Sequence, residues 1–480
     1  MRRKFITNLA LVLVLNLLTK PFWVLVIDRK VQNMVGTEGF GNYYALFNFS
    51  FLLNILLDLG ITNFNNKNIA QHHYLVTKHV SSIIVLRMLL ALVYLSITVI
   101  IGAIIGYNFL QFEQLAFILL NQIFISFILY LRSNIAGLHL FRTDSFISVL
   151  DRLIMIVICG VLIWGHVTHE QFKIQWYIYA QSTGYFLTAC ITLLIVINRV
   201  KLKKLLWRPA FFLMILKNSY PYAVLTLLMT FYTYIGTVMI ERLLPDGAEQ
   251  AGIYASANRL LDASNMIAFL FSGLLLPIFA RMIKLKEHVE EMVKLAVSLL
   301  IVPALIVAIG SFAYRVELMS LLYKNNAGQA ADVFGILMFC FVAMSSTYIF
   351  GTLLTANGNL KQLNIMASIG MVINICLNVF LIPHFKATGC ASASLATQLL
   401  TGIAQVMMVQ YIFKFNINYK FIFSLVVFII GTGIIYWASR FISPNWKICF
   451  ASAVASCFAF AFIIRLISIR NIRHILLNEQ

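Results

Sequence analysis

Charged side chains are scarce in this sequence. Only 11% of its 480 residues are Asp, Glu, Lys or Arg, whereas a soluble domain carries roughly 25%. A chain with so few charges cannot cover a large water-exposed surface, and 61% of its residues are hydrophobic. This shortage of charge argues against a soluble globular protein and indicates that lipid surrounds most of the chain.

Paired metal ligands and redox motifs are also missing. The seven cysteines lie singly within apolar segments and form no C-x-x-C pair, and thiols in such places act as small apolar residues. His166 and His169 have the spacing of metal ligands, but no set of Cys or acidic partners accompanies them. We therefore predict no metal site and no cofactor.

No long polar segment separates the apolar runs. Each connection is shorter than about 25 residues, which leaves no room for a catalytic domain outside the membrane. Arg2-Arg3-Lys4 and the apolar run after it resemble a signal peptide, but no small-x-small cleavage site follows. The run continues past Thr19-Lys20-Pro21 to Ile27, so we predict an uncleaved first span.

Basic residues are abundant relative to acidic ones, 36 against 17. They lie in short gaps between apolar runs, whereas a nucleic-acid-binding protein gathers them on one face, so we predict no nucleic-acid partner. Cytoplasmic loops retain Lys and Arg during insertion, and this rule places both termini in the cytoplasm. Among the predicted spans, Lys20 and Arg259 are singled out as the cations inside lipid.

The apolar runs predict an all-α membrane protein of about fourteen transmembrane helices. A span needs about 20 apolar residues, and an even number of spans preserves the positive-inside asymmetry. The predicted spans are 6–27, 40–61, 83–105, 112–131, 149–167, 176–197, 220–240, 253–279, 295–313, 331–353, 363–382, 389–413, 421–439 and 446–466.

A short repeat relates the two halves of the chain. Glu38-Gly39-Phe40-Gly41-Asn42-Tyr43 and Glu249-Gln250-Ala251-Gly252-Ile253-Tyr254 both read E-x-x-G-x-Y, and six spans separate them. Parallel repeats of this kind form two-lobed transporters. We predict an N-terminal lobe (1–198), a basic cytoplasmic linker (199–219), a C-terminal lobe (220–413), and two additional helices with a cytoplasmic tail (414–480).

Polar side chains within spans are costly in lipid, so their positions indicate a site. Ser, Thr and Asn also hydrogen-bond between membrane helices, and packing is the alternative interpretation for each of them. Lys20 and Arg259 differ, because a buried cation must face water or an anion. The predicted substrate-binding residues are Lys20, Arg259, Asn258, Asp262, Asn265, Asn16, Asn54, Thr226 and Thr230.

Lys20 and Arg259 are predicted to bind a phosphate together. At 1.5 Å per residue, Lys20 lies about 10 Å and Arg259 about 9 Å from the predicted outer ends of their spans. Two cations at one depth can clamp a phosphate. Alternatively, Arg259 neutralises Asp262 and Lys20 extends toward the surface. Asp58 and Asp262 are predicted to gate or couple transport, although Asp58 can also be a helix-end charge near Lys67.

Both halves of the chain contain short motifs whose order and spacing are informative together. In the first half, Gly39-Phe40-Gly41-Asn42-Tyr43 is followed by Asp58-Leu59-Gly60-Ile61. In the second half, Ala356-Asn357-Gly358 is followed by Asn374, Asn378, Ile382-Pro383 and Gly389-Cys390-Ala391-Ser392. In this order and spacing the motifs resemble those of polysaccharide-type flippases in the multidrug/oligosaccharidyl-lipid/polysaccharide exporter superfamily, and the resemblance covers the first twelve spans.

This resemblance implies two six-helix lobes around a central cavity, plus two C-terminal helices, in the inner membrane of a bacterium. The implied activity is alternating-access flipping of undecaprenyl-diphosphate-linked oligosaccharides for surface polysaccharide, for example lipopolysaccharide. A proton or sodium gradient or the membrane potential would supply the energy. Besides this lipid-linked oligosaccharide and membrane lipids, a polysaccharide polymerase and chain-length machinery are the implied partners.

Three alternatives stay open at this stage. One is a peptidoglycan-precursor flippase of the same fold. Another is a cation-coupled multidrug exporter, which usually has twelve helices and an acidic residue in its first helix; the predicted first span holds no such residue. The third is a membrane-integral polymerase, which the absence of a long outer loop argues against. The preferred interpretation is a transporter, not an enzyme.

Overall fold

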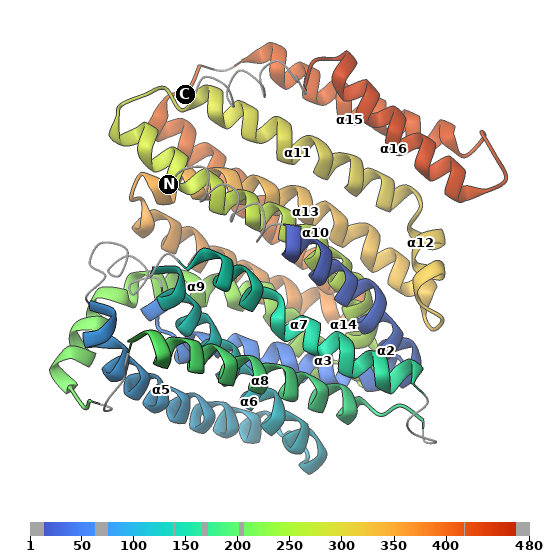
Figure 1. Ribbon diagram of the computed structural model, residues 1–480. Coiled ribbons are helices and arrows are strands. Elements are labelled where there is room, and N and C mark those ends of the chain that lie inside the picture. The colour runs from blue at the N-terminus through green and yellow to red at the C-terminus, as the bar shows by residue number, and fades with distance from the viewer. Residues whose placement is uncertain are drawn as a thin grey trace. The chain divides into compact units, whose positions relative to one another are not determined.

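The computed structural model describes residues 14–62, 75–137, 140–165, 171–200, 206–416 and 418–466, and every regular element within these ranges is a helix (Figure 1). A helix pairs its backbone polar groups within one segment, which lipid requires. Eleven of the described helices are long and apolar enough to cross a membrane. The chain is therefore a multi-pass membrane protein with an all-α fold.

Two compact units make up the chain, Met1–Gly252 and Ile253–Gln480. The first contains a helix over residues 14–22 and the elements that follow it up to the start of α10. These are η1 (Trp23–Asp28), α2 (Arg29–Val35), α3 (Thr37–Leu52), η2 (Asn54–Leu57), α5 (Leu75–Ile105), α6 (Phe109–Gly137), α7 (Phe141–Trp164), α8 (Ile174–Val200) and α9 (Pro209–Leu243). The predicted lobe and linker boundaries stay predictions.

Helix α6 is central to the packing of the first unit, since it contacts α3, α5, α7 and α8 (Figure 1). Helix α8 also packs on α7, and α3 packs on α9. Large aromatic side chains fill these contacts, and several are almost completely buried: Phe40, Tyr43, Tyr44, Tyr94, Tyr130 and Tyr177. Helix–helix packing in this unit therefore relies on aromatic contacts.

The first helix is longer than predicted. It continues beyond Ile27 through the π-helical turn η1 and through α2 to Val35. Pro21 precedes this turn, and a π turn is one way in which a helix accommodates a proline and continues. The extension places Asp28 inside the first helix.

The second helix is shorter than its predicted span 40–61. Helix α3 ends at Leu52 and is followed by the 3-10 turn η2. Leu59 and Gly60 then have φ angles of 43° and 78°, which no regular helix contains. Gly60 also lies against α9, since a Cβ there would be 2.7 Å from the carbonyl oxygen of Ser219.

The second unit contains α10 (Gly247–Lys284) from Ile253 onward and the remaining helices. These are α11 (Glu290–Ala313), α12 (Arg315–Leu322), α13 (Ala327–Ala356), α14 (Leu360–Phe413), α15 (Tyr419–Ser439) and α16 (Trp446–Ile463). The α14 segment covers two predicted spans, 363–382 and 389–413, and breaks at Lys386, where φ is 53° and ψ is −132°. The short α12 was not expected from the sequence.

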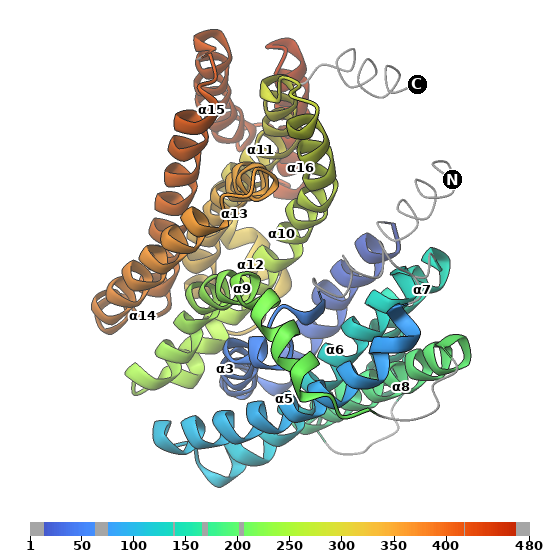
Figure 2. The ribbon, with the colours of Figure 1, turned by 90° about the vertical axis from the view of Figure 1, so that its left-hand side faces the viewer.

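The two C-terminal helices pack against α11 (Figure 2). Gly310 on α11 leaves space for the ring of Tyr436 on α15, because a Cβ at Gly310 would lie 2.4 Å from the Tyr436 hydroxyl. That hydroxyl donates to the carbonyl oxygen of Ile306 at 3.1 Å. The predicted additional helices are therefore an integral part of the second unit's core.

Candidate functional site

The first helix and α7 form a polar contact that includes two predicted site residues. Asn16 donates to the hydroxyl of Ser148 at 3.0 Å, as the packing interpretation of Asn16 predicts. One turn further along, half-buried Lys20 experiences the charges of Arg152, Asp151 and Arg132. The structure thus surrounds Lys20 with charged residues of α6 and α7 that the sequence analysis did not single out.

Of these charges, that of Arg152 acts most strongly on Lys20. The Arg152 guanidinium is held in place. Its Nη1 donates to the hydroxyl of Tyr185 on α8 at 2.8 Å, and its Cζ lies 5.7 Å from the ring centre of Trp23. Helix α8 approaches α7 closely here, since a Cβ at Gly184 would lie 2.7 Å from Met155 Cγ. Small residues allow membrane helices to approach in this way.

Lys20 and Arg259 are therefore not the only cations inside the predicted spans, contrary to the expectation from the sequence. Arg152 lies within the predicted span 149–167 and Arg87 within 83–105. Each lies in a helix whose mean hydropathy is high, so that the average over the span concealed the single cation. A search for single cations within each span would have found both.

An acidic residue also lies in the first helix, which corrects the expectation that none is there. Asp28 is 2% exposed and accepts a hydrogen bond from the hydroxyl of Tyr177 on α8. The ring of Tyr177 stacks on Trp23 at 5.7 Å between centroids. Asp28 also acts electrostatically on Arg152. Asp28 was not expected in this helix because the predicted span 6–27 ends one residue earlier.

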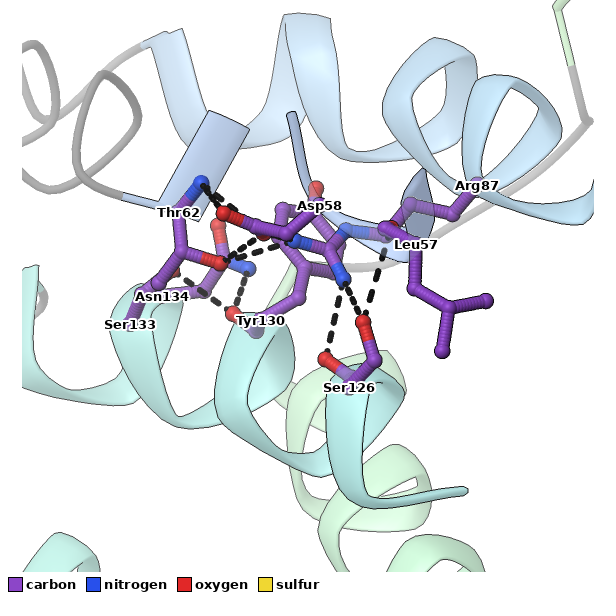
Figure 3. A network of polar contacts seen from close by, with 8 residues as sticks. All are labelled: Leu57, Asp58, Thr62, Arg87, Ser126, Tyr130, Ser133 and Asn134. Atoms are coloured by element: carbon purple, nitrogen blue, oxygen red, sulfur yellow. Dashed lines mark hydrogen bonds and ion pairs between the residues drawn. The ribbon is translucent and has the colours of Figure 1, made fainter. Parts of the chain in front are cut away.

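A second charged network surrounds Asp58, at the break after η2. Figure 3 shows the Arg87 guanidinium between Asp58 and Thr62 on one side and Ser126 of α6 on the other. Arg87 Nη2 contacts both the Asp58 carboxylate and the Thr62 hydroxyl, and Nη1 donates to the Ser126 carbonyl at 2.9 Å and hydroxyl at 2.8 Å. The Tyr130 ring covers the guanidinium at 4.7 Å.

This network assigns Asp58 a partner that the sequence analysis did not consider. Arg87 is 5% exposed, and a buried cation requires such a counter-ion. Asp58 also accepts from the backbone N–H of Thr62 at 3.2 Å, which stabilises the turn that follows. Lys67, the alternative neighbour, lies outside the described residues. The gating role of Asp58 stays a prediction.

Asn54 is the first residue of η2 and contacts α6. Its Nδ2 donates to Gln122 Oε1 at 2.8 Å, and Gln122 Nε2 lies 3.4 Å from the Ser50 hydroxyl. Tyr43 on α3 exchanges hydrogen bonds with Gln181 of α8. These side chains join helices, as the packing interpretation predicts.

Predicted binding residues on α10 make polar contacts within the second unit. Asn258 Nδ2 donates to Asp262 Oδ2 at 3.4 Å, and Asn265 Nδ2 donates to the Tyr348 hydroxyl of α13 at 3.4 Å. Arg259 is half-buried beside them. These contacts bring Asn258 and Asp262 together on α10 and join Asn265 to α13, whereas the role of these residues in binding stays a prediction.

The two predicted threonines of α9 differ in exposure. Thr226 is exposed and Thr230 is half-buried. Further along α9, Thr233 bonds to the Met229 carbonyl of its own helix at 2.8 Å. Within the described part of the chain, no three His, Cys, Asp or Glu side chains gather as a metal site requires; His166 and His169 lie outside it.

Lys20 and Arg259 belong to different compact units, so their joint clamp stays a prediction. The longer helices change the depth estimate for both. Lys20 lies about 22 Å from Val35 and Arg259 about 18 Å from Gly247, at 1.5 Å per residue. Each cation therefore lies about twice as far from that end of its helix as the predicted spans implied.

Solved structures of similar fold are transporters and flippases. The lipid II flippase MurJ in an inward closed conformation has a TM-score of 0.73 at 12% identity, with 95% of this chain and 98% of that chain covered. An inward-facing multidrug resistance MATE family transporter of the MOP superfamily gives 0.64 at 13% identity, covering 82% and 94%. A MOP superfamily transporter from Pyrococcus furiosus gives 0.58 at 12% identity, covering 85% and 95%.

These likenesses show a fold of the MurJ and MATE type. No curated protein matches the sequence. A family model described as "Polysaccharide biosynthesis protein" matches residues 5–283, which is more than half of the chain. The chain therefore belongs to the polysaccharide biosynthesis protein family.

Proposed function

We propose that this protein flips an undecaprenyl-diphosphate-linked oligosaccharide across the bacterial inner membrane by alternating access. It acts as a carrier and not as an enzyme, with both termini in the cytoplasm. The head group passes through a polar interior while the polyprenyl tail remains in lipid. A polysaccharide polymerase and chain-length machinery would act on the delivered units.

The observation that carries this proposal is membership of a polysaccharide biosynthesis family on a flippase-type fold. Every described element is helical and eleven helices can span a membrane, which suits transport of an amphiphile. The first unit also contains cations within its helices, Lys20, Arg87 and Arg152. Such charges suit an anionic cargo, because buried cations in membrane helices mark substrate paths.

A peptidoglycan-precursor flippase is the second candidate. The observation that favours it is the likeness to the lipid II flippase over 95% of this chain. The third candidate, a cation-coupled multidrug exporter, draws support from the MATE-type fold and from buried Asp28 in the first helix. One assay separates the three.

The experiment uses the purified full-length protein in liposomes that contain a tagged lipid-linked oligosaccharide. A lectin that cannot cross the bilayer reports the fraction of sugar head groups on the outside. We expect the protein to make the inner-leaflet pool accessible to the lectin. In liposomes without protein, the accessible fraction of head groups should stay constant. Parallel samples contain lipid II or a cationic fluorescent drug.

Movement of lipid II or of the drug, without movement of the lipid-linked oligosaccharide, would contradict the proposed cargo. Imposed proton, sodium and potential gradients in the same liposomes identify the energy source. Movement that is independent of all three would indicate a facilitated exchange.

A further inference from the structure

The first helix and α7 run side by side in the same direction. Asn16 contacts Ser148 at 3.0 Å, and seven residues later Trp23 lies 5.7 Å from the guanidinium of Arg152. Lys20 follows Asn16 by four residues, as Arg152 follows Ser148. Because residues four apart share a helix face, Lys20 and Arg152 lie at one level on facing helices.

Two of the three charges that act on Lys20 are positive. Among the residues that the structure describes, it makes no hydrogen bond or ion pair, and the charge with the largest effect on it is the cation Arg152. Asp151 acts on it less strongly and Arg132 adds a further positive charge. Arg132 itself is paired with Asp144 at 2.8 Å.

Arg152, in contrast, is fixed from one side. Its Nη1 bonds to Tyr185, and its guanidinium lies 5.6 Å from the Tyr185 ring. Asp28 and Asp151 balance its charge from a distance. Nη1 is the one guanidinium nitrogen that hydrogen-bonds within the described ranges, which leaves the N–H groups on Nε and Nη2 for another acceptor.

Two neighbouring cations in a membrane segment repel each other more strongly than in water, because the dielectric constant is low. An arrangement that holds an unpaired ammonium beside an arginine is stabilised when an anion bridges them. A guanidinium binds phosphate through two parallel N–H groups, whereas an ammonium acts as a flexible point charge. Two cations of these different kinds suit two linked phosphoryl groups.

We propose that Lys20 and Arg152 together form a diphosphate-binding site within the first unit, and that this site distinguishes a lipid diphosphate from a lipid monophosphate. Arg152 binds one phosphoryl group in fixed geometry and Lys20 neutralises the other. Tyr185 is a positioning residue that holds Arg152. The assignment of the ligand to the transported lipid rests on the proposed function; the anion selectivity does not.

The test measures binding of farnesyl diphosphate and farnesyl monophosphate to the purified protein in phosphatidylcholine nanodiscs. We expect the diphosphate to bind at least about tenfold more tightly, equivalent to about 1.4 kcal/mol. Lys20→Gln and Arg152→Gln should each remove most of this preference, and Arg152→Lys should retain part of it. Tyr185→Phe should weaken diphosphate binding less than Arg152→Gln. Arg315→Gln, a cation of the second unit, is the matched control and should change neither affinity.

Melting temperatures of all variants identify those that fail to fold. If Arg152→Gln fails to fold, Lys20→Gln and Arg152→Lys still decide the outcome, since each of these variants keeps a cation at position 152. Equal affinity for the two lipids, or unchanged affinity in folded Lys20 variants, would overturn the site. Diphosphate binding without flipping in liposomes would instead refute the proposed function and leave the site in place. Flipping that is as fast in the Lys20→Gln variant as in the unchanged protein would instead refute the site and leave the proposed function in place.

Discussion

Gly41 of α3 and Gly252 of α10 meet where the two helices cross, and neither position has room for a side chain. A Cβ at Gly41 would lie 1.8 Å from the carbonyl oxygen of Ala248, and a Cβ at Gly252 would lie 2.0 Å from that of Thr37. Thr37 and Ala248 are separated by the same 211 positions as the two glycines. The contact is therefore reciprocal, as expected for equivalent positions of an internal repeat.

This contact predicts that Gly41→Ala and Gly252→Ala each force α3 and α10 apart. We expect each variant to lose about 1–3 kcal/mol or more, because overpacking against backbone cannot be relieved by a rotamer change. Thermal unfolding in detergent measures the loss. Gly273→Ala on the same α10 is the control, since nothing lies within 4 Å of a Cβ there. If all three variants melt alike, the close crossing is not required.

The Arg87–Asp58 pair predicts a large effect from removing one partner. Arg87→Leu leaves the Asp58 carboxylate without its cation, and breaking a buried pair costs about 3–5 kcal/mol. The Asp58 side chain is 25% exposed, which favours the lower end. Arg87→Leu combined with Asp58→Asn should recover much of the loss, since the amide oxygen still accepts from Thr62. The exposed Arg315–Asp332 pair is the comparison, where Arg315→Leu should cost about 1 kcal/mol or less.

A topology experiment tests the proposed orientation. A reporter that is active only in the cytoplasm, fused after Gln480, should give signal, because the basic loops are retained on that side. A second fusion within the connection between α5 and α6 should be silent. Signal from the second fusion and silence from the first would reverse the orientation, whereas silence from both fusions would require an odd number of spans.

The predicted role of Arg259 can be separated from pairing with Asp262. If Arg259 binds the cargo, Arg259→Ala should abolish transport while the protein accumulates normally. Arg259→Lys should be partly active, because a point charge replaces a planar fork. If Arg259 merely balances a neighbouring carboxylate, the double variant Arg259→Ala/Asp262→Ala should regain transport, since no unpaired charge remains. Recovery in the double variant would exclude the predicted clamp.

Much of the architecture follows from the sequence alone. Apolar runs long enough for a span can only be helical in lipid, and each of the fourteen predicted spans overlaps a helix in the described ranges. The matching E-x-x-G-x-Y segments indicated a repeat, and the reciprocal contact of Gly41 and Gly252 agrees with it. The ends of helices were predicted less accurately. The first helix, for example, continues through the polar residues from Asp28 onward, because packing against α8 stabilises this part of the helix.

Only the tertiary structure decided which polar side chains meet. Asp58 and Arg87 are 29 positions apart, and Lys20 and Arg152 are 132 apart, so no local pattern links them. Their pairing depends on which helix faces are adjacent and at what level, which apolar periodicity does not encode when both faces of a helix are hydrophobic. For Asp58 and Arg87, burial then selects the partners, because a charge inside lipid is stable only beside a complementary group.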